Sequence, residues 1–142
     1  MPYTPDPLDP TAPLDGEVAL SAPAEFRAIK AYIGKFPVVS VSANKTFALA
    51  DAGTDQLHPD SDTSSRTWLV PDNSVVPFPV GTMITISVEH GAGNILLAMA
   101  GTDTMRLIPT GTTGTRTLPP NSVTTIKKIK PTVWQCVTNG GS

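Results

Sequence analysis

The amino-acid sequence predicts an all-β protein: a jelly-roll-like antiparallel β-sandwich with an extended N-terminal arm and one short N-terminal helix. Only 15% of the 142 residues are charged, whereas proline and glycine contribute 15 and 11 residues, a composition that favours strands and turns. Short apolar runs separated by turn residues recur about every ten residues. The phrase SRTWLVPDNSV at 65–75 returns as TRTLPPNSV at 115–123, and a repeated corner is typical of a β shell.

The same composition excludes several classes of function. A formal net charge of −2 offers no basic face to a nucleic acid partner. The single cysteine, Cys136, allows no internal disulfide. No apolar run approaches the ~20 residues of a transmembrane helix, and the first residues lack the basic and then apolar layout of a signal peptide. We therefore expect cytoplasmic synthesis, with no nucleic acid and no membrane as partners.

Residues 1–20 are predicted to form an extended arm. Prolines interleaved with Asp and Glu disfavour a helix, and a fully extended arm of this length reaches roughly 60 Å at ~3.1 Å per residue. The arm is either a disordered tail or a segment that lies along a neighbouring subunit. Spaced aliphatic residues favour the second possibility. The candidate contact residues of the arm are Pro5, Pro7, Leu8, Pro10, Leu14, Val18 and Leu20.

Residues 21–36 are predicted to form a short docking helix. Ser21 can cap its N-terminus, Pro23 fits its first turn, and Gly34 favours its end. Apolar residues recur at helical spacing along one face. This face packs either on the core of the same chain or on a facing subunit. The candidate contact residues of the helix are Phe26, Arg27, Lys30 and Tyr32.

Residues 37–142 are predicted to form the β-sandwich domain. The alternation in MITISV predicts a half-buried strand, and EHGAGN predicts a hairpin from it to NILLAM. The two copies of the repeated phrase predict equivalent units of strand, corner and strand. Their structural corner residues are Arg66, Pro71, Asn73, Arg116, Pro119 and Asn121. The expected strands are 38–42, 46–50, 66–70, 75–79, 83–88, 94–98, 105–108, 115–118, 123–129 and 132–137.

Candidate reactive groups are few. His58 lies in QLHPDSDTSS with three nearby aspartates, but this segment lacks the glycine and the distal glutamate of a calcium-binding EF-hand loop. A polar loop is therefore favoured over a metal site. His58 and His90 are expected at the surface and Cys136 in the core, and this combination disfavours a Cys/His catalytic pair. We expect no catalytic residues, no metal and no cofactor. The three aspartates are Asp55, Asp60 and Asp62.

The run IKKIK at 126–130 is the main basic cluster. Strand alternation places Lys127 and Lys128 on opposite faces. We expect this strand to protect a sheet edge from wrong pairing, with a contact to an acidic protein surface as the alternative. The aromatic residues at strand positions are expected in the core and not on a carbohydrate-binding surface. They are Phe47, Trp68, Phe78 and Trp134.

Two segments resemble virion proteins of tailed bacteriophages. The first, DPTAPLDGEVALSAPAEFRAIKAYI, resembles an amino-terminal leader of phage structural proteins. The second, which carries LADAG, HP, SRT, NS, FPVGT and GTTGTRTL, resembles a β module of head decoration proteins and of some tail or head fibres. Together they cover nearly the whole chain, and its length and layout are most similar to the small cement proteins of short-tailed phages. The resemblance implies a structural jelly-roll module without catalytic residues.

These observations predict a structural virion protein that decorates and cements the outer surface of a phage capsid by bridging neighbouring major capsid protein subunits. The expected partners are the major capsid protein and the chain itself, as a homodimer or a trimer. The alternative is a tail or head fibre module that binds a host receptor or glycan, although the chain has no heptads for a trimerising stalk. An enzyme ranks last because acid and base residues do not cluster.

Overall fold

The computed structural model of the chain describes residues 36–140 and 142. Within this part, Pro37–Ser142 form one compact unit that contains one short 3-10 helix, η1 (Leu49–Asp51), and ten strands. The predicted arm and residues 21–35 of the predicted helix lie outside the described residues. The strands are β1 (Val38–Ser40), β2 (Lys45–Thr46), β3 (Asp55–His58), β4 (Arg66–Val70), β5 (Met83–Val88), β6 (Ile95–Met99), β7 (Thr104–Leu107), β8 (Arg116–Leu118), β9 (Ser122–Lys130) and β10 (Val133–Asn139).

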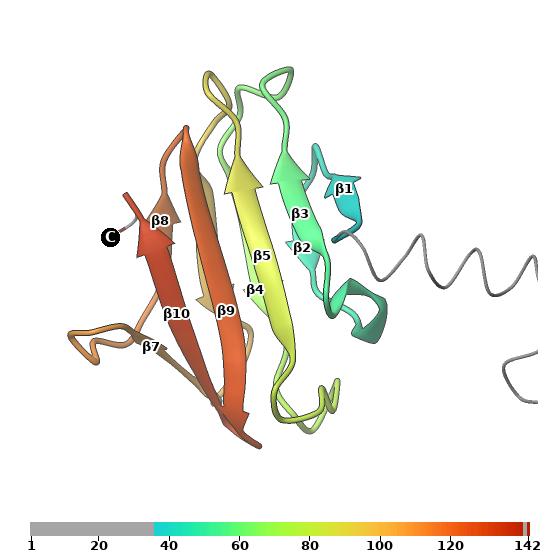
Figure 1. Cartoon of the computed structure of the whole chain (residues 1–142), viewed down its shortest axis with the longest axis vertical. Helices are drawn as coiled ribbons and strands as arrows, with labels where there is room; N and C mark the ends of the chain where they lie inside the picture. Colours follow the sequence, from blue (N-terminus) through green and yellow to red (C-terminus); the bar gives the residue numbers. More distant parts are fainter. Residues whose placement is uncertain (1–35, 141) are drawn as a thin grey trace, which may run out of the picture. The chain divides into compact units, whose positions relative to one another are not determined.

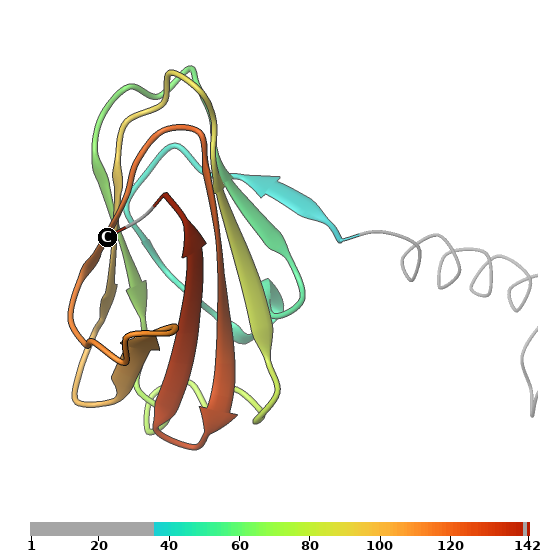
Figure 2. The same ribbon diagram turned by 60° about the vertical axis from the view of Figure 1, so that its left-hand side comes forward.

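The strands form two sheets that face each other (Figures 1 and 2). The large sheet has the strand order β1-β3-β5-β9-β10-β7, and the small sheet has the order β2-β4-β6-β8. Each strand from β1 to β8 is followed along the chain by a strand of the other sheet. Within the described residues, the single hairpin inside one sheet joins β9 to β10. The all-β class predicted from the sequence is therefore confirmed.

The first six strands wind as a coil of parallel strands. In the large sheet β1, β3 and β5 run parallel, and in the small sheet β2, β4 and β6 do the same. Strands β8, β9 and β10 pair antiparallel with β6, β5 and β9, whereas β7 pairs parallel with β10. Neighbouring strands of a jelly roll run antiparallel, so the predicted antiparallel pairing holds for three of the eight strand pairs in the described residues and is wrong for the other five. Alternating polarity identifies the buried face of a strand but neither its partner nor its direction.

The expected hairpin between β5 and β6 is also wrong, because these strands belong to different sheets. The loop at 89–94 instead packs against the loop at 59–65, which belongs to the preceding winding of the coil. The backbone N–H of Gly93 donates to the carbonyl of Asp62 at 3.0 Å. A Cβ atom on Gly93 would lie 2.2 Å from the carbonyl oxygen of Ser64, so this close approach requires glycine. The motif EHGAGN therefore marks the contact between two turns of the coil.

Other predicted strands exist with small changes at their ends. The ranges 66–70 and 83–88 coincide with β4 and β5. The range 75–79 is not a strand, because the N–H groups of Val75 and Val76 both donate to the carbonyl of Asp72 in a turn. Prolines in this range also lack the N–H groups that a central strand requires.

Strand β3 and helix η1 were not expected from the sequence. The range 46–50 was predicted as a strand, but the chain turns into η1, where the carboxylate of Asp51 accepts the N–H of Ala48 at 2.7 Å. Strand β3 lies within the segment that was predicted to be a polar loop. Its inward-facing residues, Gln56 and His58, are buried. Polar residues at the buried positions of β3 hid the alternation that normally predicts a strand.

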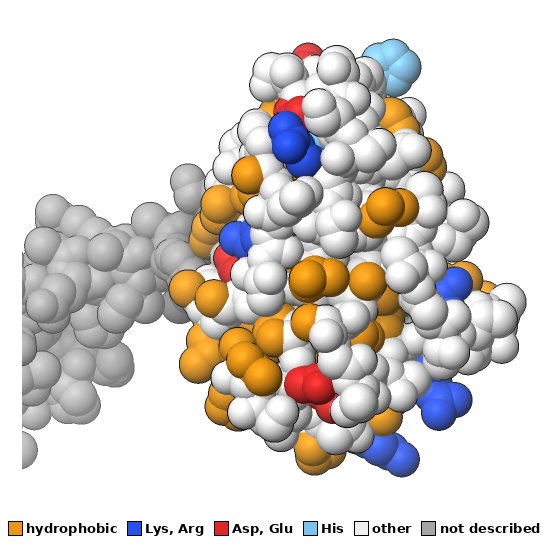
Figure 3. All heavy atoms as spheres, turned by 180° about the vertical axis from the view of Figure 1, so that it is seen from behind, with side chains coloured by type: hydrophobic (Ala, Val, Ile, Leu, Met, Phe, Trp, Pro, Cys, Tyr) orange, Lys and Arg blue, Asp and Glu red, His pale blue; other side chains and the backbone are white. Residues whose placement is uncertain are grey.

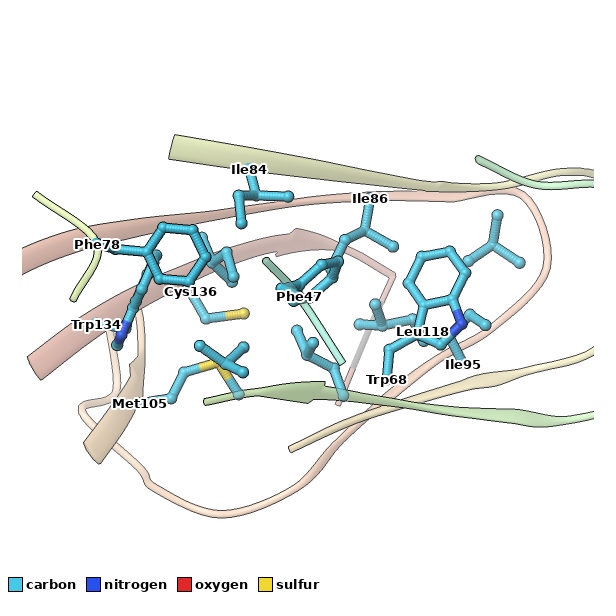
Figure 4. Close-up of a cluster of buried hydrophobic side chains, with 14 of the residues drawn as sticks. Phe47, Trp68, Phe78, Ile84, Ile86, Ile95, Met105, Leu118, Trp134 and Cys136 are labelled. Carbon is cyan, nitrogen blue, oxygen red and sulfur yellow. The ribbon is translucent and has the colours of Figure 1, made fainter. Parts of the chain in front are cut away.

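The core lies between the sheets and contains two aromatic groups (Figure 4). The ring of Trp68 packs edge-on against Phe47 and against His58, with centroids 6.1 Å apart in both pairs. Phe78 packs edge-on against Trp134 at 5.5 Å. All four predicted core aromatics are buried, which confirms that prediction. Around them pack side chains from both sheets, including Ile84, Ile86, Ile95, Met105, Leu118 and Cys136.

Candidate functional site

Two of the four edge strands are covered by other parts of the domain. The outer side of β8 is covered by Ser142, which exchanges two backbone hydrogen bonds with Thr117, at 2.8 and 3.1 Å. The outer side of β7 is covered by an antiparallel bridge between Arg106 and Thr113. The other two edge strands, β1 and β2, belong to the first turn of the coil. The open side of the domain is therefore the side where the chain enters it.

Strand β1 exposes apolar side chains along the open edge of the large sheet. In the described part of the chain it pairs with β3 alone, and Val38 and Val39 are 61% and 39% exposed. Seen from the side opposite to Figure 1, exposed hydrophobic side chains gather on the side of the first strands, at the left of the view (Figure 3). An exposed apolar edge strand is a template for pairing with another chain. We call Val38–Ser40 the N-terminal edge.

The predicted capsid-contact residues of the arm and helix, from Pro5 to Tyr32, all lie outside the described residues. The structure therefore does not place them relative to the N-terminal edge. It does place the six predicted corner residues. They divide into two arginines at strand starts, two prolines and two asparagines, and the two members of each pair have different contacts.

The repeated arginines each tie the start of a strand to a residue four positions earlier. Nε and Nη2 of Arg66 donate to the two carboxylate oxygens of Asp62, at 2.7 and 3.1 Å. These hydrogen bonds lower the pKa of Asp62 and raise the pKa of Arg66. Arg116 is 7% exposed and donates to the carbonyl of Thr112. Each contact fixes the loop that leads into β4 or β8.

The first corner is closed by the carboxylate of Asp72, which follows the buried Pro71. It accepts the backbone N–H groups of Asp103 and Thr102, both at 2.9 Å. These two hydrogen bonds lower the pKa of Asp72, and the bond from Asp103 has the larger effect on it. A Cβ atom on Gly101 would lie 1.9 Å from this carboxylate. The corner after β4 is therefore locked onto the loop between β6 and β7.

The second corner has the same order of residues but different contacts. The carbonyl of Pro119 accepts the hydroxyl of Ser122 at 2.6 Å. Asn121 adopts a left-handed backbone with φ of 61°, a conformation that asparagine tolerates better than most residues. This corner leads directly from β8 into β9, whereas the first leads from β4 into an irregular loop before β5. Both corners carry the chain from the small sheet to the large sheet, but the predicted equivalence of the two units is wrong beyond that point.

Asn73 and Lys128 meet beneath the first corner. Lys128 is 1% exposed, and its Nζ donates to Oδ1 of Asn73 at 2.6 Å. The same Nζ lies 5.7 Å from the ring centroid of Trp134. The carboxylate of Asp103 accepts the backbone N–H of Asn73 at 2.8 Å. Burial lowers the pKa of Lys128, and the negative charge of Asp103 offsets part of this effect.

The position of β9 corrects the expected role of the IKKIK run. Strand β9 lies between β5 and β10, so it does not protect a sheet edge. The prediction that Lys127 and Lys128 face opposite sides is confirmed, because Lys127 is exposed and Lys128 is buried. Strand alternation alone could have placed Lys128 on the same face as Thr124 and Ile126. The charge of its side chain argued against a buried position.

The two histidines and the cysteine have different surroundings. His58 is fully buried, with its two ring nitrogens 3.3 and 3.2 Å from the carbonyl oxygens of Val41 and Ser64, so the expectation that it lies at the surface is wrong. His90 is exposed on the turn after β5. Burial raises the pKa of the Cys136 thiol, which favours the unreactive protonated form. Among residues 36–140 and 142, no three His, Cys, Asp or Glu side chains cluster as metal ligands would.

A hollow of about 330 Å³ lies beside β6, β7 and residues 113–115. Asp103 is the single carboxylate of its lining, which otherwise consists of apolar, threonine and glycine residues. One carboxylate does not supply the acid and base pair of a hydrolytic site.

Two further observations bear on function. No helix in the described part of the chain is long and apolar enough to cross a membrane. Comparison of the chain with protein-family models, with curated proteins and with solved structures finds no match.

Proposed function

We propose that the chain is a structural virion protein that decorates and cements the outer surface of a phage capsid. The observation that carries this proposal is the open N-terminal edge. Val38 and Val39 present apolar surface on a strand with one unpaired side in the described residues, whereas the edges at β7 and β8 are covered. The resemblance of the leader and of the β segment to phage decoration proteins supports the same class.

The proposed mechanism gives different tasks to different parts of the chain. The domain at 37–142 acts as a rigid body on one major capsid protein subunit, and residues 1–36 extend the contact to a neighbouring subunit. Two weak sites on one chain bind with an avidity that exceeds either affinity. The N-terminal edge adds backbone hydrogen bonds by pairing with a strand of the partner. Many copies then resist the outward pressure of packaged DNA across the subunit seams.

The proposal includes no catalysis, no cofactor and no nucleic acid contact. Synthesis takes place in the host cytoplasm, and the chain reaches the virion by assembly. Pairing of two or three copies through a symmetric contact is part of the proposal, since closed symmetry is common among small assemblies. The alternative is a fibre module that binds a host receptor or glycan. Trp68 cannot stack on a sugar because it is fully buried, so glycan binding would depend on exposed residues such as His90.

Binding to capsids of the phage that encodes the chain tests the proposal. Full chain, a variant without residues 1–20 and the variant Val39→Lys are each mixed with undecorated capsids, and the bound copies are measured by cosedimentation. We expect both changes to weaken binding by about tenfold or more, because each removes one contact or places a charge in an apolar one.

The matched control is Val75→Lys, which adds the same charge at a side chain that is 73% exposed in the loop between β4 and β5. This variant should bind as the unmodified chain does. Undiminished binding by both the truncated chain and Val39→Lys would contradict the bridging mechanism. Binding to host glycans in place of capsids would favour the fibre alternative.

A further inference from the structure

Lys128 is a buried amine without a counter-ion. No carboxylate lies within ion-pair distance of its Nζ in the described part of the chain. Burial of an ammonium without a counter-ion costs free energy, because the neutral contacts around it replace only part of the lost hydration. The pKa of Lys128 is accordingly lowered by burial, in spite of the nearby charge of Asp103. A lysine that loses its proton in this way becomes a nucleophile.

The carboxamide of Asn73 is an electrophile in direct contact with that amine. Its Oδ1 accepts the hydrogen bond from Nζ at 2.6 Å, one bond away from Cγ. The backbone of Asn73 is held by Asp103 at 2.8 Å, and Asp103 is held in turn by Asp72 at 2.9 Å. Groups fixed in contact in this way react as if at very high concentration.

The surroundings of the contact are apolar on the side of the core. The Trp134 ring lies 5.7 Å from Nζ, and Phe78 packs edge-on against Trp134. The side chains of Lys128, Trp134 and Phe78 are all buried. Exclusion of water from such a site disfavours hydrolysis of a bond formed there. The corresponding corner residue of the second copy, Asn121, is exposed and serves as an internal comparison.

We propose that Lys128 and Asn73 form an intramolecular isopeptide bond. The neutral Nζ attacks Cγ of Asn73, a C–N bond forms, and the carbonyl π electrons move to Oδ1. One proton passes from Nζ to Nδ2 within the tetrahedral adduct, and the negative charge of Asp103 stabilises the positive charge that develops on Nζ. The carbonyl then re-forms, the Cγ–Nδ2 bond breaks, and Nδ2 leaves with its electron pair as ammonia. One amide is exchanged for another, so the reaction requires no oxidant, reductant or cofactor.

The intact mass of the full chain tests this proposal. We expect a mass lower than the sequence mass by one ammonia, and a branched tryptic peptide that joins residues 67–106 to residues 128–142. Asn73→Ala, at a half-exposed corner, and Lys128→Met should each abolish both signals. The matched controls Asn121→Gly and Lys127→Met change the equivalent corner and the exposed neighbouring lysine, and both should keep the two signals.

The charge of Asp103 has its own test. Asp103→Asn keeps an oxygen that can accept the N–H of Asn73 but removes the negative charge near Nζ. We expect this variant to release ammonia about tenfold more slowly after refolding, because the positive charge that develops on Nζ is no longer stabilised. A release rate equal to that of the unmodified chain would contradict this role of Asp103.

Two results would overturn the isopeptide bond itself. The first is a refolded full chain that keeps its whole sequence mass after long incubation at neutral and mildly alkaline pH. The second is a loss of ammonia that persists in Asn73→Ala or maps to another residue, such as a cyclic imide at Asn139, which precedes a glycine.

Discussion

The ion pair between Asp62 and Arg66 makes the stability of the domain sensitive to acid. The hydrogen bonds from Arg66 lower the pKa of Asp62 in the folded chain, so the unfolded chain binds the proton more readily as the pH falls. The stabilisation is present above the pKa of the unfolded chain and is lost as the pH falls through the folded pKa. We expect Arg66→Gln to reduce the free energy of unfolding at neutral pH and to have less effect in strong acid.

Urea unfolding at both pH values measures this difference. Arg106→Gln is the matched control, because Arg106 is an exposed arginine without an ion pair in residues 36–140 and 142. It should cost little at either pH. An equal loss for Arg66→Gln at neutral and acidic pH would contradict the assignment of the acid sensitivity to this pair.

Trp68 links the core to the loop before β2. It is fully buried, and its indole N–H donates to the carbonyl of Ala43 at 2.9 Å. Trp68→Ala should reduce the free energy of unfolding by about 3–5 kcal/mol through loss of burial and creation of a cavity. The exposed Val75→Ala should change it by less than about 0.5 kcal/mol. Chemical denaturation measures both, and similar small effects would contradict the position of Trp68 in the core.

At the scale of the elements, Gly93 controls the contact between two turns of the parallel coil. A Cβ atom there would meet the backbone carbonyl of Ser64, which cannot move as a side chain can. We expect Gly93→Ala to cost about 1–3 kcal/mol through this overlap. The control is Gly53→Asn, at a left-handed position with φ of 71° and open space around it. A cost for Gly93→Ala no larger than for this control would contradict the close contact between turns.

The sequence predicted strands well where alternate residues were apolar and β-branched. Strands β4 and β5 have their predicted ends, because alternate residues of both are apolar and buried. These residues are Trp68 and Val70 in β4 and Ile84 and Ile86 in β5. Strand β3 was missed because Gln56 and His58 are polar, and their burial depends on partners that only the fold supplies. Parallel pairing was missed for a similar reason, since no local pattern specifies the direction of a neighbouring strand.

At the candidate sites too, the sequence predicted local features but not contacts between residues far apart along the chain. Proline and asparagine predicted a turn at each corner from local backbone preferences. The contact between Asn73 and Lys128 joins residues 55 positions apart, and no spacing rule relates them. The open N-terminal edge was equally inaccessible, because an edge is defined only after every strand has found its sheet.

At the scale of the whole molecule, the isopeptide bond would connect the corner after β4 to the centre of the large sheet. A crosslink across 55 positions stabilises by about 4 kcal/mol if it acts by restricting the unfolded chain. We expect Asn73→Ala to unfold at a lower temperature than the unmodified chain, as measured by circular dichroism. Asn121→Gly should show a much smaller decrease. Equal midpoints for Asn73→Ala and the unmodified chain would contradict a role for the crosslink in stability.

The chain combines a β domain, whose edge strands β1 and β2 are uncovered in the described residues, with a proline-rich segment that precedes it in the sequence. The covered edges at β7 and β8 protect the domain from uncontrolled pairing, which suits a protein that assembles in many copies. In the proposed function, the N-terminal edge and residues 1–36 are the parts that bind the partner. This division of tasks is the central claim of the proposed decoration function.

Cryo-electron microscopy of capsids reconstituted with the full chain tests that claim most directly. We predict density for the domain on the outer surface, with Val38–Ser40 against one major capsid protein subunit and residues 1–36 reaching a neighbouring subunit. Val39→Lys should reduce the occupancy of these positions, and Val75→Lys should not. Capsids without bound chain, or chain bound at the tail alone, would contradict the decoration function.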